Sequence, residues 1–281
     1  MRYLIIGGTG TLGKELIHRL YGNAEIDIFS RDEFKQYQIK KVYPDVRCIL
    51  GDIRQYSDID FDYSVYDAVF HTAALKHVDI GENNVDQFIQ TNLNGTINVS
   101  KKCSSCNTRL VFFSTDKAVL PINAYGMTKA LAEKYLMNTN KNAVIFRWGN
   151  ILGSRGSIIS YFTDIIQNGG HVPITHLDMS RFWLTINEVV DFVMENFAKH
   201  TDVNSVLIPR VKSATVQQIA LAIGKLLDKP VKFTETGIRP GEKIHEHLYS
   251  DHDYCVRSDN CEKFTMDDLI IKLRPLIEEL T

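Results

Sequence analysis

A tyrosine and a lysine four residues apart, Tyr125 and Lys129, form the pair whose spacing best suits proton transfer. Residues four apart share one face of a helix, and the segment 125–138 is expected to be helical. A lysine ammonium beside a tyrosine hydroxyl stabilises the phenolate, which can then take a proton from an alcohol as a hydride leaves. The Y-x-x-x-K pattern is common by chance, so its weight depends on the residues before it.

Three polar residues, Thr115, Asp116 and Lys117, precede this pair and follow the apolar run 110–113 after Ser114. In an open parallel sheet, ligands bind beyond the carboxyl ends of the strands, which places this segment on the ligand side. Either charged side chain could act as acid or base in a desolvated pocket. The alternative is that the two charges form an ordinary surface turn.

A glycine-rich turn, GGTGTLG at 7–13, follows the apolar run 3–6 and precedes an amphipathic helical pattern. Positions without side chains let the backbone turn sharply and approach a pyrophosphate, and the helix behind it presents free N–H groups. A plain turn is the alternative, but the strand before and the helix after are the context that dinucleotide binding requires. The predicted cofactor contacts here are Gly7, Thr9, Gly10, Thr11, Leu12 and Gly13.

The tip of the second apolar run carries Ser30 and Arg31, with Lys35 close behind. An acidic residue at this place would accept from a free ribose 2′-OH, whereas an arginine suits a 2′-phosphate. We therefore expect NADP, with NAD as the alternative; Arg31 could also be a solvated surface residue. Asp52 and Ile53 follow the third run, where Asp52 is placed to contact the adenine.

Residues 73–78, after the fourth apolar run, combine two small residues with a lysine. Ala73 and Ala74 leave space for the cofactor, and Lys76 is a candidate contact to the sugar or the diphosphate. His77 could shuttle a proton, but a buried structural histidine is an equal alternative.

Apolar runs alternate with helical periodicity through the first 150 residues. Such runs, separated by helices, predict a parallel sheet covered on both faces. We expect an α/β fold: a Rossmann-type doubly wound sheet over 1–150 and a smaller, mainly substrate-binding lobe over 151–281, from which about 176–205 returns to the core. The strands are expected at 3–6, 26–29, 46–50, 68–70, 110–113 and 143–146, and prominent helices at 86–102 and 125–138.

Composition and charge restrict the function classes. The formal net charge of −2 gives no bulk support for nucleic acid or anionic membranes as partners. No signal-peptide pattern or run of about 20 apolar residues is present, so a cytoplasmic location is expected. The C-x-x-C spacing of Cys103 and Cys106 has no second pair, which favours ordinary reduced thiols. His245, Glu246 and His247 could suggest a metal site, but none is expected.

Matching motifs span nearly the whole chain in one order: GGTGTLGK (7–14), SRDEFKQ (30–36), AALKHV (73–78), STDKAVLPINAYGMTKALAEK (114–134), RWGNILGSRGS (147–157), SRFWLTINE (180–188) and IRPGEKIHE (238–246). With them the chain resembles the extended short-chain dehydrogenases/reductases. More narrowly, it is similar to the soluble, C5-inverting UDP-N-acetylglucosamine 4,6-dehydratases of the polysaccharide-biosynthesis group.

This resemblance implies a reaction in three steps. Hydride leaves sugar C4 for NADP⁺, water is eliminated across C5 and C6, and the hydride returns to C6. By resemblance, Tyr125 deprotonates the C4 hydroxyl, Asp116 protonates the departing C6 hydroxyl and Lys117 serves C5. Thr115 would bond the C4 oxygen, and Lys129 would hold the ribose and tune Tyr125. Which of Asp116 and Lys117 is the acid stays open.

The nucleotide-sugar end is expected from the second half of the chain. Asn150 resembles a sugar or diphosphate contact, and the guanidinium forks of Arg155, Arg181 and Arg239 suit a diphosphate. Glu242 could accept from a uridine ribose hydroxyl. For each arginine alone, a structural salt bridge is the alternative.

Two rival functions remain at this stage. A nucleotide-sugar 4-epimerase or 4-reductase typically lacks the Asp-Lys pair, and a catalytically silent NADP-binding regulator would tend to lose Tyr125 or Lys129. A homo-oligomer is expected, since the helices that begin at Asp86 and Tyr125 are the usual dimerisation surface in relatives.

Overall fold

The computed structural model describes residues 1–154, 156–199, 205–250 and 255–281. The chain forms two compact units, which are described one at a time. The first comprises Met1–Arg147 and Val190–Ile208, and the second comprises Trp148–Val189 and Pro209–Thr281. Across the described residues, no helix has the length and apolar character needed to cross a membrane.

The first unit is built on a seven-stranded sheet whose strands pair in parallel in the order β10-β6-β5-β4-β1-β2-β3. The order reverses between β1 and β4, which is the switch point where doubly wound sheets bind ligands. This confirms the expected Rossmann-type α/β fold. The strands are β1 (Arg2–Ile6), β2 (Glu25–Ser30), β3 (Arg47–Leu50), β4 (Ala68–His71), β5 (Arg109–Thr115), β6 (Ala143–Trp148) and β10 (Val206–Leu207).

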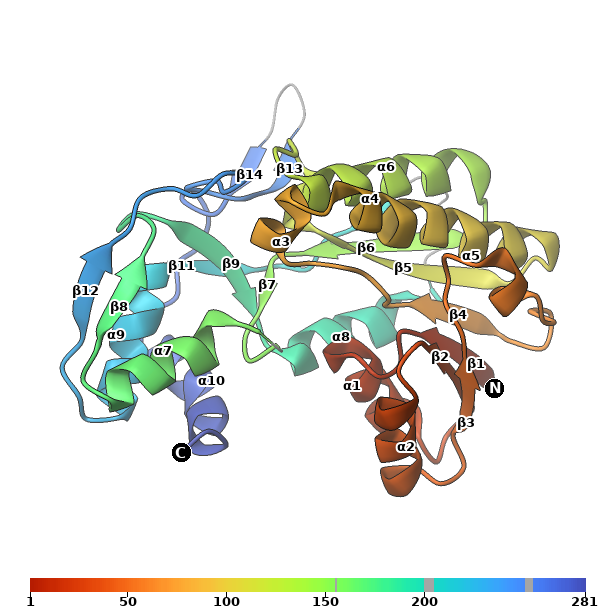
Figure 1. The fold of residues 1–281 in the computed structure, drawn as a ribbon, viewed down its shortest axis with the longest axis horizontal. Helices are drawn as coiled ribbons and strands as arrows, with labels where there is room; N and C mark the ends of the chain where they lie inside the picture. The colour runs from red at the N-terminus through yellow and green to blue at the C-terminus, as the bar shows by residue number, and fades with distance from the viewer. Residues whose placement is uncertain (155, 200–204, 251–254) are drawn as a thin grey trace. The chain divides into compact units, whose positions relative to one another are not determined.

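Helices cover both faces of this sheet, with α4, α5 and α6 on one face and α1, α2 and α8 on the other (Figure 1). The helix expected at 86–102 is interrupted by a π-helical turn, η2. The α-helices are α1 (Thr11–Leu20), α2 (Glu33–Val42), α3 (Val78–Glu82), α4 (Val85–Phe88), α5 (Gly95–Ser105), α6 (Ala124–Thr139) and α8 (Ile186–Asn196); shorter turns are η1 (Tyr56–Ile59), η2 (Ile89–Asn94) and η3 (Asp116–Ala118).

Alternate residues of the central strands pack against opposite helical layers. Leu4 and Phe112 join Val99 of α5 and Leu136 of α6 in one buried core cluster. On the other face, the Tyr3 ring packs edge-on against Phe70 and Phe197, with ring centroids 5.6 and 6.1 Å apart. Because both faces are buried, these strands are apolar throughout, as the sequence shows.

The second unit contains three small sheets and three helices. The segment returning to the first unit starts at Val190, later than the expected 176, because β9 pairs with β7 and β11 within the second unit. The sheets are β7 (Asn150–Ile151), β9 (Ser180–Leu184) and β11 (Lys212–Thr215); β8 (His171–Ile174) and β12 (Lys232–Glu235); and β13 (His247–Ser250) and β14 (Cys255–Arg257). The helices are α7 (Ile158–Gln167), α9 (Val216–Leu226) and α10 (Met266–Glu278).

The second unit has its own apolar core. Phe162 of α7, Ile219 of α9 and Leu273 of α10 are all buried in one cluster with Trp183 of β9. The Trp183 indole donates to the Ala214 carbonyl oxygen at 3.1 Å, which ties the core to the β9–β11 pair.

Candidate functional site

The turn between β1 and α1 is shaped by the absence of side chains. Gly7 has φ +84°, and a Cβ there would lie 2.7 Å from the Ala73 nitrogen. A Cβ on Gly13 would lie 2.6 Å from the Gly7 carbonyl oxygen. Helix α1 begins behind the turn with Gly10 as its N-cap, a residue with no side chain to cap the first N–H groups. The turn therefore offers backbone donors and the positive end of a helix to an anion.

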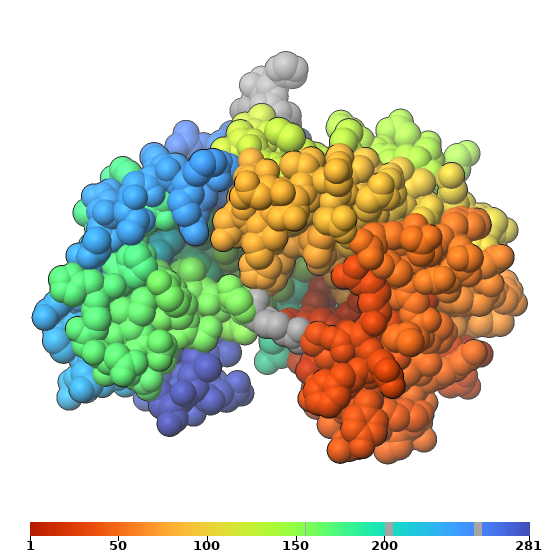
Figure 2. All heavy atoms as spheres, viewed as in Figure 1, coloured from red at the N-terminus to blue at the C-terminus, as the bar shows by residue number. Residues whose placement is uncertain are grey.

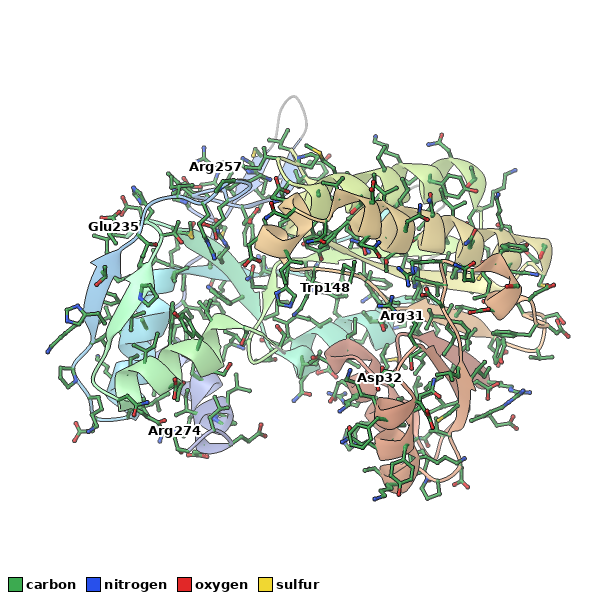
Figure 3. All side chains as sticks on the ribbon, in the orientation of Figure 1. Arg31, Asp32, Trp148, Glu235, Arg257 and Arg274 are labelled. Atoms are coloured by element: carbon green, nitrogen blue, oxygen red, sulfur yellow. The ribbon has the colours of Figure 1, made fainter. Side chains whose placement is uncertain are left out.

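The end of β2 gathers charges of both signs (Figure 3). Arg31 is half exposed, and its guanidinium lies 3.6 Å from the Asp52 carboxylate. Asp32 caps α2 by accepting from the Lys35 backbone N–H at 3.0 Å, and it also pairs with the Lys35 ammonium. Lys35 is thus already held by an acidic partner. Of the two cations, Arg31 is the more exposed, with 50% of its side chain open to solvent against 36% for Lys35.

Asp52 is held as an anion at the end of β3. Burial opposes the effect, but hydrogen bonds from Arg54 at 2.6 to 3.0 Å and the charge of Arg31 lower the pKa of Asp52. The neighbouring Ile53 side chain is buried and faces Gly95 of α5. Ile53 therefore packs in the core, and any contact from it to a cofactor would come from its backbone.

The segment after β4 borders the glycine turn. Ala73 lies against Gly7, and the Leu75 backbone exchanges two hydrogen bonds of 2.8 and 2.9 Å with the side chain of Asn92. Ala74, Lys76 and His77 are exposed. The alternative of a buried structural histidine at 77 is therefore wrong: His77 precedes the short helix α3 as its N-cap.

Thr115, Asp116 and Lys117 come together at the end of β5. Asp116 is fully buried, and its Oδ1 accepts from the Thr115 hydroxyl and the Lys117 ammonium, each at 3.0 Å. The Thr115 oxygen in turn accepts from the Lys117 backbone N–H at 3.3 Å. The side chains form one hydrogen-bonded cluster, which is more ordered than a plain surface turn requires.

Helix α6 is fixed against this cluster by residues that were not among the predicted site residues. Asn123 caps α6 by accepting from the Gly126 N–H at 2.7 Å. A Cβ on Gly126 would overlap the carbonyl oxygen of Lys117, so a glycine is needed for η3 to pack on α6. The Ala124 N–H donates to Glu82 at 2.8 Å. Gly126 is visible in the sequence, but only the tertiary structure shows that it packs against the Lys117 carbonyl oxygen.

Lys129 is buried on α6, whereas Tyr125, one turn earlier, is partly exposed. The lysine ammonium lies over the Phe112 ring, 3.8 Å from its centroid. Burial lowers the pKa of Lys129 to about 7, and the Glu133 carboxylate opposes this change. Glu133 is itself paired with Arg147, with Nη2 at 2.6 Å and Nε at 3.0 Å. The ammonium is therefore held in a desolvated site with few compensating charges.

In the second unit, Arg181 is almost fully engaged by protein. Its Nη1 donates to the Ser180 and Ile244 carbonyl oxygens at 2.7 and 3.0 Å, and Nε lies 3.8 Å from Glu246. By contrast, the Oδ1 atom of Asn150 is buried with no hydrogen-bond partner among the described atoms. A buried acceptor without a donor favours a ligand contact at Asn150.

Arg239 and Glu242 bind each other across one turn of their loop. The Arg239 Nη2 lies 2.5 Å from Glu242 Oε1, and the Arg239 side chain is 61% exposed. The Glu242 side chain is only 14% exposed, so the arginine is the partner that can turn toward a phosphate in the solvent. Arg155, the third expected arginine, lies outside the described residues.

Two histidines, His245 and His247, lie in β13 and the loop before it. His245 Nδ1 lies 2.8 Å from the Ser180 hydroxyl, and burial lowers the pKa of His245 and of His247. Within the described ranges, no cluster of three or more His, Cys, Asp or Glu residues could hold a metal ion.

A family model described as polysaccharide biosynthesis protein matches residues 3–267. The chain belongs to this family. It is 36% identical over 264 residues to a UDP-N-acetylglucosamine 4,6-dehydratase (inverting) of Campylobacter jejuni, covering 89% of this chain and 78% of that protein. It is 35% identical over 272 residues to a UDP-glucose 4-epimerase of Rickettsia massiliae, covering 91% and 80%.

Among solved structures, the X-ray structure of Pen from Bacillus thuringiensis superposes with a TM-score of 0.89 at 28% identity. It covers 100% of this chain and 98% of that one. The structural similarity therefore covers both units of this chain.

Proposed function

We propose that this protein is a nucleotide-sugar 4,6-dehydratase that converts UDP-N-acetylglucosamine to a UDP 4-keto-6-deoxy sugar. The supporting observation is the buried Thr115–Asp116–Lys117 cluster packed against the helix that carries Tyr125 and Lys129. A tyrosine and lysine suffice for oxidation at C4, but elimination of water also needs an acid and a base. The similarity to a named dehydratase supports the same reaction.

A nicotinamide dinucleotide fits the turn of the first unit, because Gly7 and Gly13 let the backbone fold more tightly than any Cβ would allow and α1 presents its N–H groups. When bound, it supplies the hydride acceptor for sugar C4. Arg31 supports NADP over NAD, since its side chain is half exposed and its 3.6 Å pairing with Asp52 is looser than that of Lys35 with Asp32. The other phosphate and adenine contacts are those expected from the sequence.

Oxidation at C4 requires that the hydroxyl lose its proton. Tyr125, at the partly exposed start of α6, takes this proton. Thr115 turns its hydroxyl proton from Asp116 to the C4 oxygen when substrate binds. Lys129 in its charged form stabilises the Tyr125 phenolate. The ketone that results makes the C5 hydrogen acidic, which prepares the elimination.

The Asp116–Lys117 pair can serve both sides of the elimination. Transfer of one proton along the 3.0 Å hydrogen bond converts the ion pair to a neutral acid and a neutral amine, and burial favours the neutral form. The Lys117 amine then takes the C5 proton while the Asp116 acid protonates the departing C6 hydroxyl. Water leaves, and the pair returns to its charged state, so the protons balance.

The test is turnover of UDP-N-acetylglucosamine in deuterated water, followed by NMR. The proposal expects a 4-keto-6-deoxy product with deuterium at C5 and no net reduced cofactor. The configuration at C5 in that product shows whether this centre is inverted. A simple C4 epimer would contradict the proposal and favour the epimerase reading, which the Rickettsia relative also supports. No turnover of any UDP-sugar would favour a silent cofactor-binding protein.

We also propose that the protein is a homo-oligomer through the α4–α6 layer. Helices α3 to α5 form an outer surface of the first unit in Figure 2. Apolar side chains on this layer are exposed, which is costly in an isolated protein. They are Val85, Ile89, Ile122, Met127 and Leu131.

A further inference from the structure

His71 is a buried histidine that the proposed reaction does not use. It ends β4, between β1 and β5, and it is 1% exposed. Its Nε2 lies 3.0 Å from the Thr96 hydroxyl oxygen of α5, and that hydroxyl donates its proton to the Asn92 carbonyl oxygen at 2.7 Å. Because a hydroxyl has a single proton, Nε2 must be the donor to Thr96. The ring is therefore protonated on Nε2 and carries a lone pair on Nδ1.

This lone pair has no hydrogen-bond partner among the described atoms, although Nδ1 is buried. A buried acceptor without a donor costs free energy and is uncommon in native proteins. Burial, together with the positive charge of Lys129, lowers the pKa of His71 to about 3. The ring therefore stays neutral at any ordinary pH, and Nδ1 remains an acceptor.

The Lys129 ammonium is a donor close enough for its charge to lower the pKa of His71. Both groups lie against Phe112: the His71 and Phe112 ring centroids are 5.8 Å apart, and Lys129 Nζ is 3.8 Å from the Phe112 centroid. An ammonium has three protons to donate, and an aromatic face satisfies them only in part. The one carboxylate that acts on it, Glu133, shares its charge with Arg147.

We propose that His71 is a positioning residue for Lys129, whose ammonium donates to the Nδ1 lone pair through one bound water. This contact stabilises the charged form of the lysine and holds its orientation beside Tyr125. The inference rests on the proposed function only for the role given to Lys129. The hydrogen bond itself does not depend on which sugar is bound or which reaction follows.

Other charged and titratable groups on α6, or in contact with it, must be unchanged in any comparison. Glu133 acts directly on the pKa of Lys129 and is paired with Arg147 of β6. The others are Tyr125 on α6 and the Asp116–Lys117 pair of η3, which packs against Gly126.

A matched pair of variants separates the two nitrogens of the ring. Asparagine at 71 places an amide oxygen near the position of Nδ1, whereas glutamine reaches the position of Nε2 and loses the Nδ1 acceptor. The full chain is labelled with [ε-¹³C]lysine, the Lys129 signal is assigned from its loss in Lys129→Met, and it is titrated by NMR. We expect His71→Gln to raise the acid dissociation constant of Lys129 about tenfold and His71→Asn to leave it nearly unchanged.

The control is Thr96→Val, which removes the partner of Nε2 but leaves Nδ1 in place; it should lower stability without moving the Lys129 titration. An unchanged titration in His71→Gln would overturn the proposal. Should that variant not fold, the ¹⁵N shift of Nδ1 in the unsubstituted protein decides, and a shift typical of a free lone pair refutes the contact. Neither measurement uses a substrate, so failure of the proposed dehydratase activity leaves both readable.

Discussion

Two loops at the same edge of the sheet differ in whether the backbone or the side chains supply the functional groups. The β1–α1 turn works through its backbone: Gly7 and Gly13 leave no space for a Cβ. The β5–α6 segment works through side chains, since Asp116 is fully buried with the Lys117 ammonium bonded to it. A resident phosphate needs close approach and fixed N–H donors, whereas proton transfer needs groups that titrate.

The two loops therefore differ in the kind of substitution that should impair them. In the glycine turn, a Cβ on Gly7 or Gly13 collides with backbone, so the damage from a substitution there is steric. In the β5–α6 segment, an isosteric change keeps the shape and removes only the chemistry. Gly126 is the exception in the β5–α6 segment. It lies against the Lys117 carbonyl, so a side chain at this position would cause a steric clash.

The largest expected effect is that of Tyr125→Phe. Removing one hydroxyl from the partly exposed start of α6 should slow C4 oxidation about 10³-fold while the cofactor still binds. Transient formation of reduced cofactor, followed by absorbance after mixing with UDP-N-acetylglucosamine, measures this step. Tyr135→Phe on the same helix is the matched control, and equal losses in the two variants would contradict the role of Tyr125.

Gly13→Ala should weaken cofactor binding about 100-fold, because the new Cβ would lie 2.6 Å from the Gly7 carbonyl oxygen. Gly10→Ala should weaken it less, since its Cβ would approach the same oxygen only to 3.2 Å. Calorimetric titration with NADP ranks the two variants. The reverse ranking would show that backbone crowding does not govern this turn.

Asp116→Asn should separate the two halves of the chemistry. The amide keeps the shape of the acid but cannot protonate a leaving hydroxyl, so dehydration should slow about 100-fold. Oxidation at C4, read from loss of a C4 deuterium label to the cofactor, should change much less. Intact dehydration in this variant would refute the acid role of Asp116.

Lys129→Met should stabilise the fold, because it removes a buried charge. The folded-state pKa of about 7 lies below the ordinary value of 10.5, so the folded state binds fewer protons than the unfolded state between these values. Stability therefore rises with pH across this window, and the cost of burying the charge is fully present below about pH 7. Urea unfolding at pH 6 should show a gain of about 1–3 kcal/mol, and the variant should lose the rise between pH 7 and 10.

The smallest effect is expected for Arg31→Gln, which should reduce the preference for NADP over NAD about tenfold. The ratio of the two dissociation constants is the measurement. Arg47→Gln is the control, because Arg47 is also largely exposed but pairs with Asp27 inside the sheet edge. An unchanged ratio in Arg31→Gln would show that this residue does not determine the preference for NADP over NAD.

Much of the first unit was predictable because its signals are local. Buried parallel strands must be apolar on both faces, and helices show a period near 3.6 residues, so the order of elements can be followed along the chain. The pairs Gly7–Gly13 and Tyr125–Lys129 are likewise local, since one turn or one helix fixes each. The second unit was harder to predict, because β7, β9 and β11 come from distant segments and contribute two to five residues each.

The sequence by itself determined which groups are present and which share a helix or a turn: the glycines of 7–13, the cluster 115–117 and the Tyr125–Lys129 face. Tertiary structure alone decided their environment. Burial beside Phe112 lowers the Lys129 pKa, and parallel pairing of β4 with β5 brings His71 to the same ring. Spacing along a chain carries no information on desolvation or on partners sixty residues away, and the electrostatics of this site depend on both.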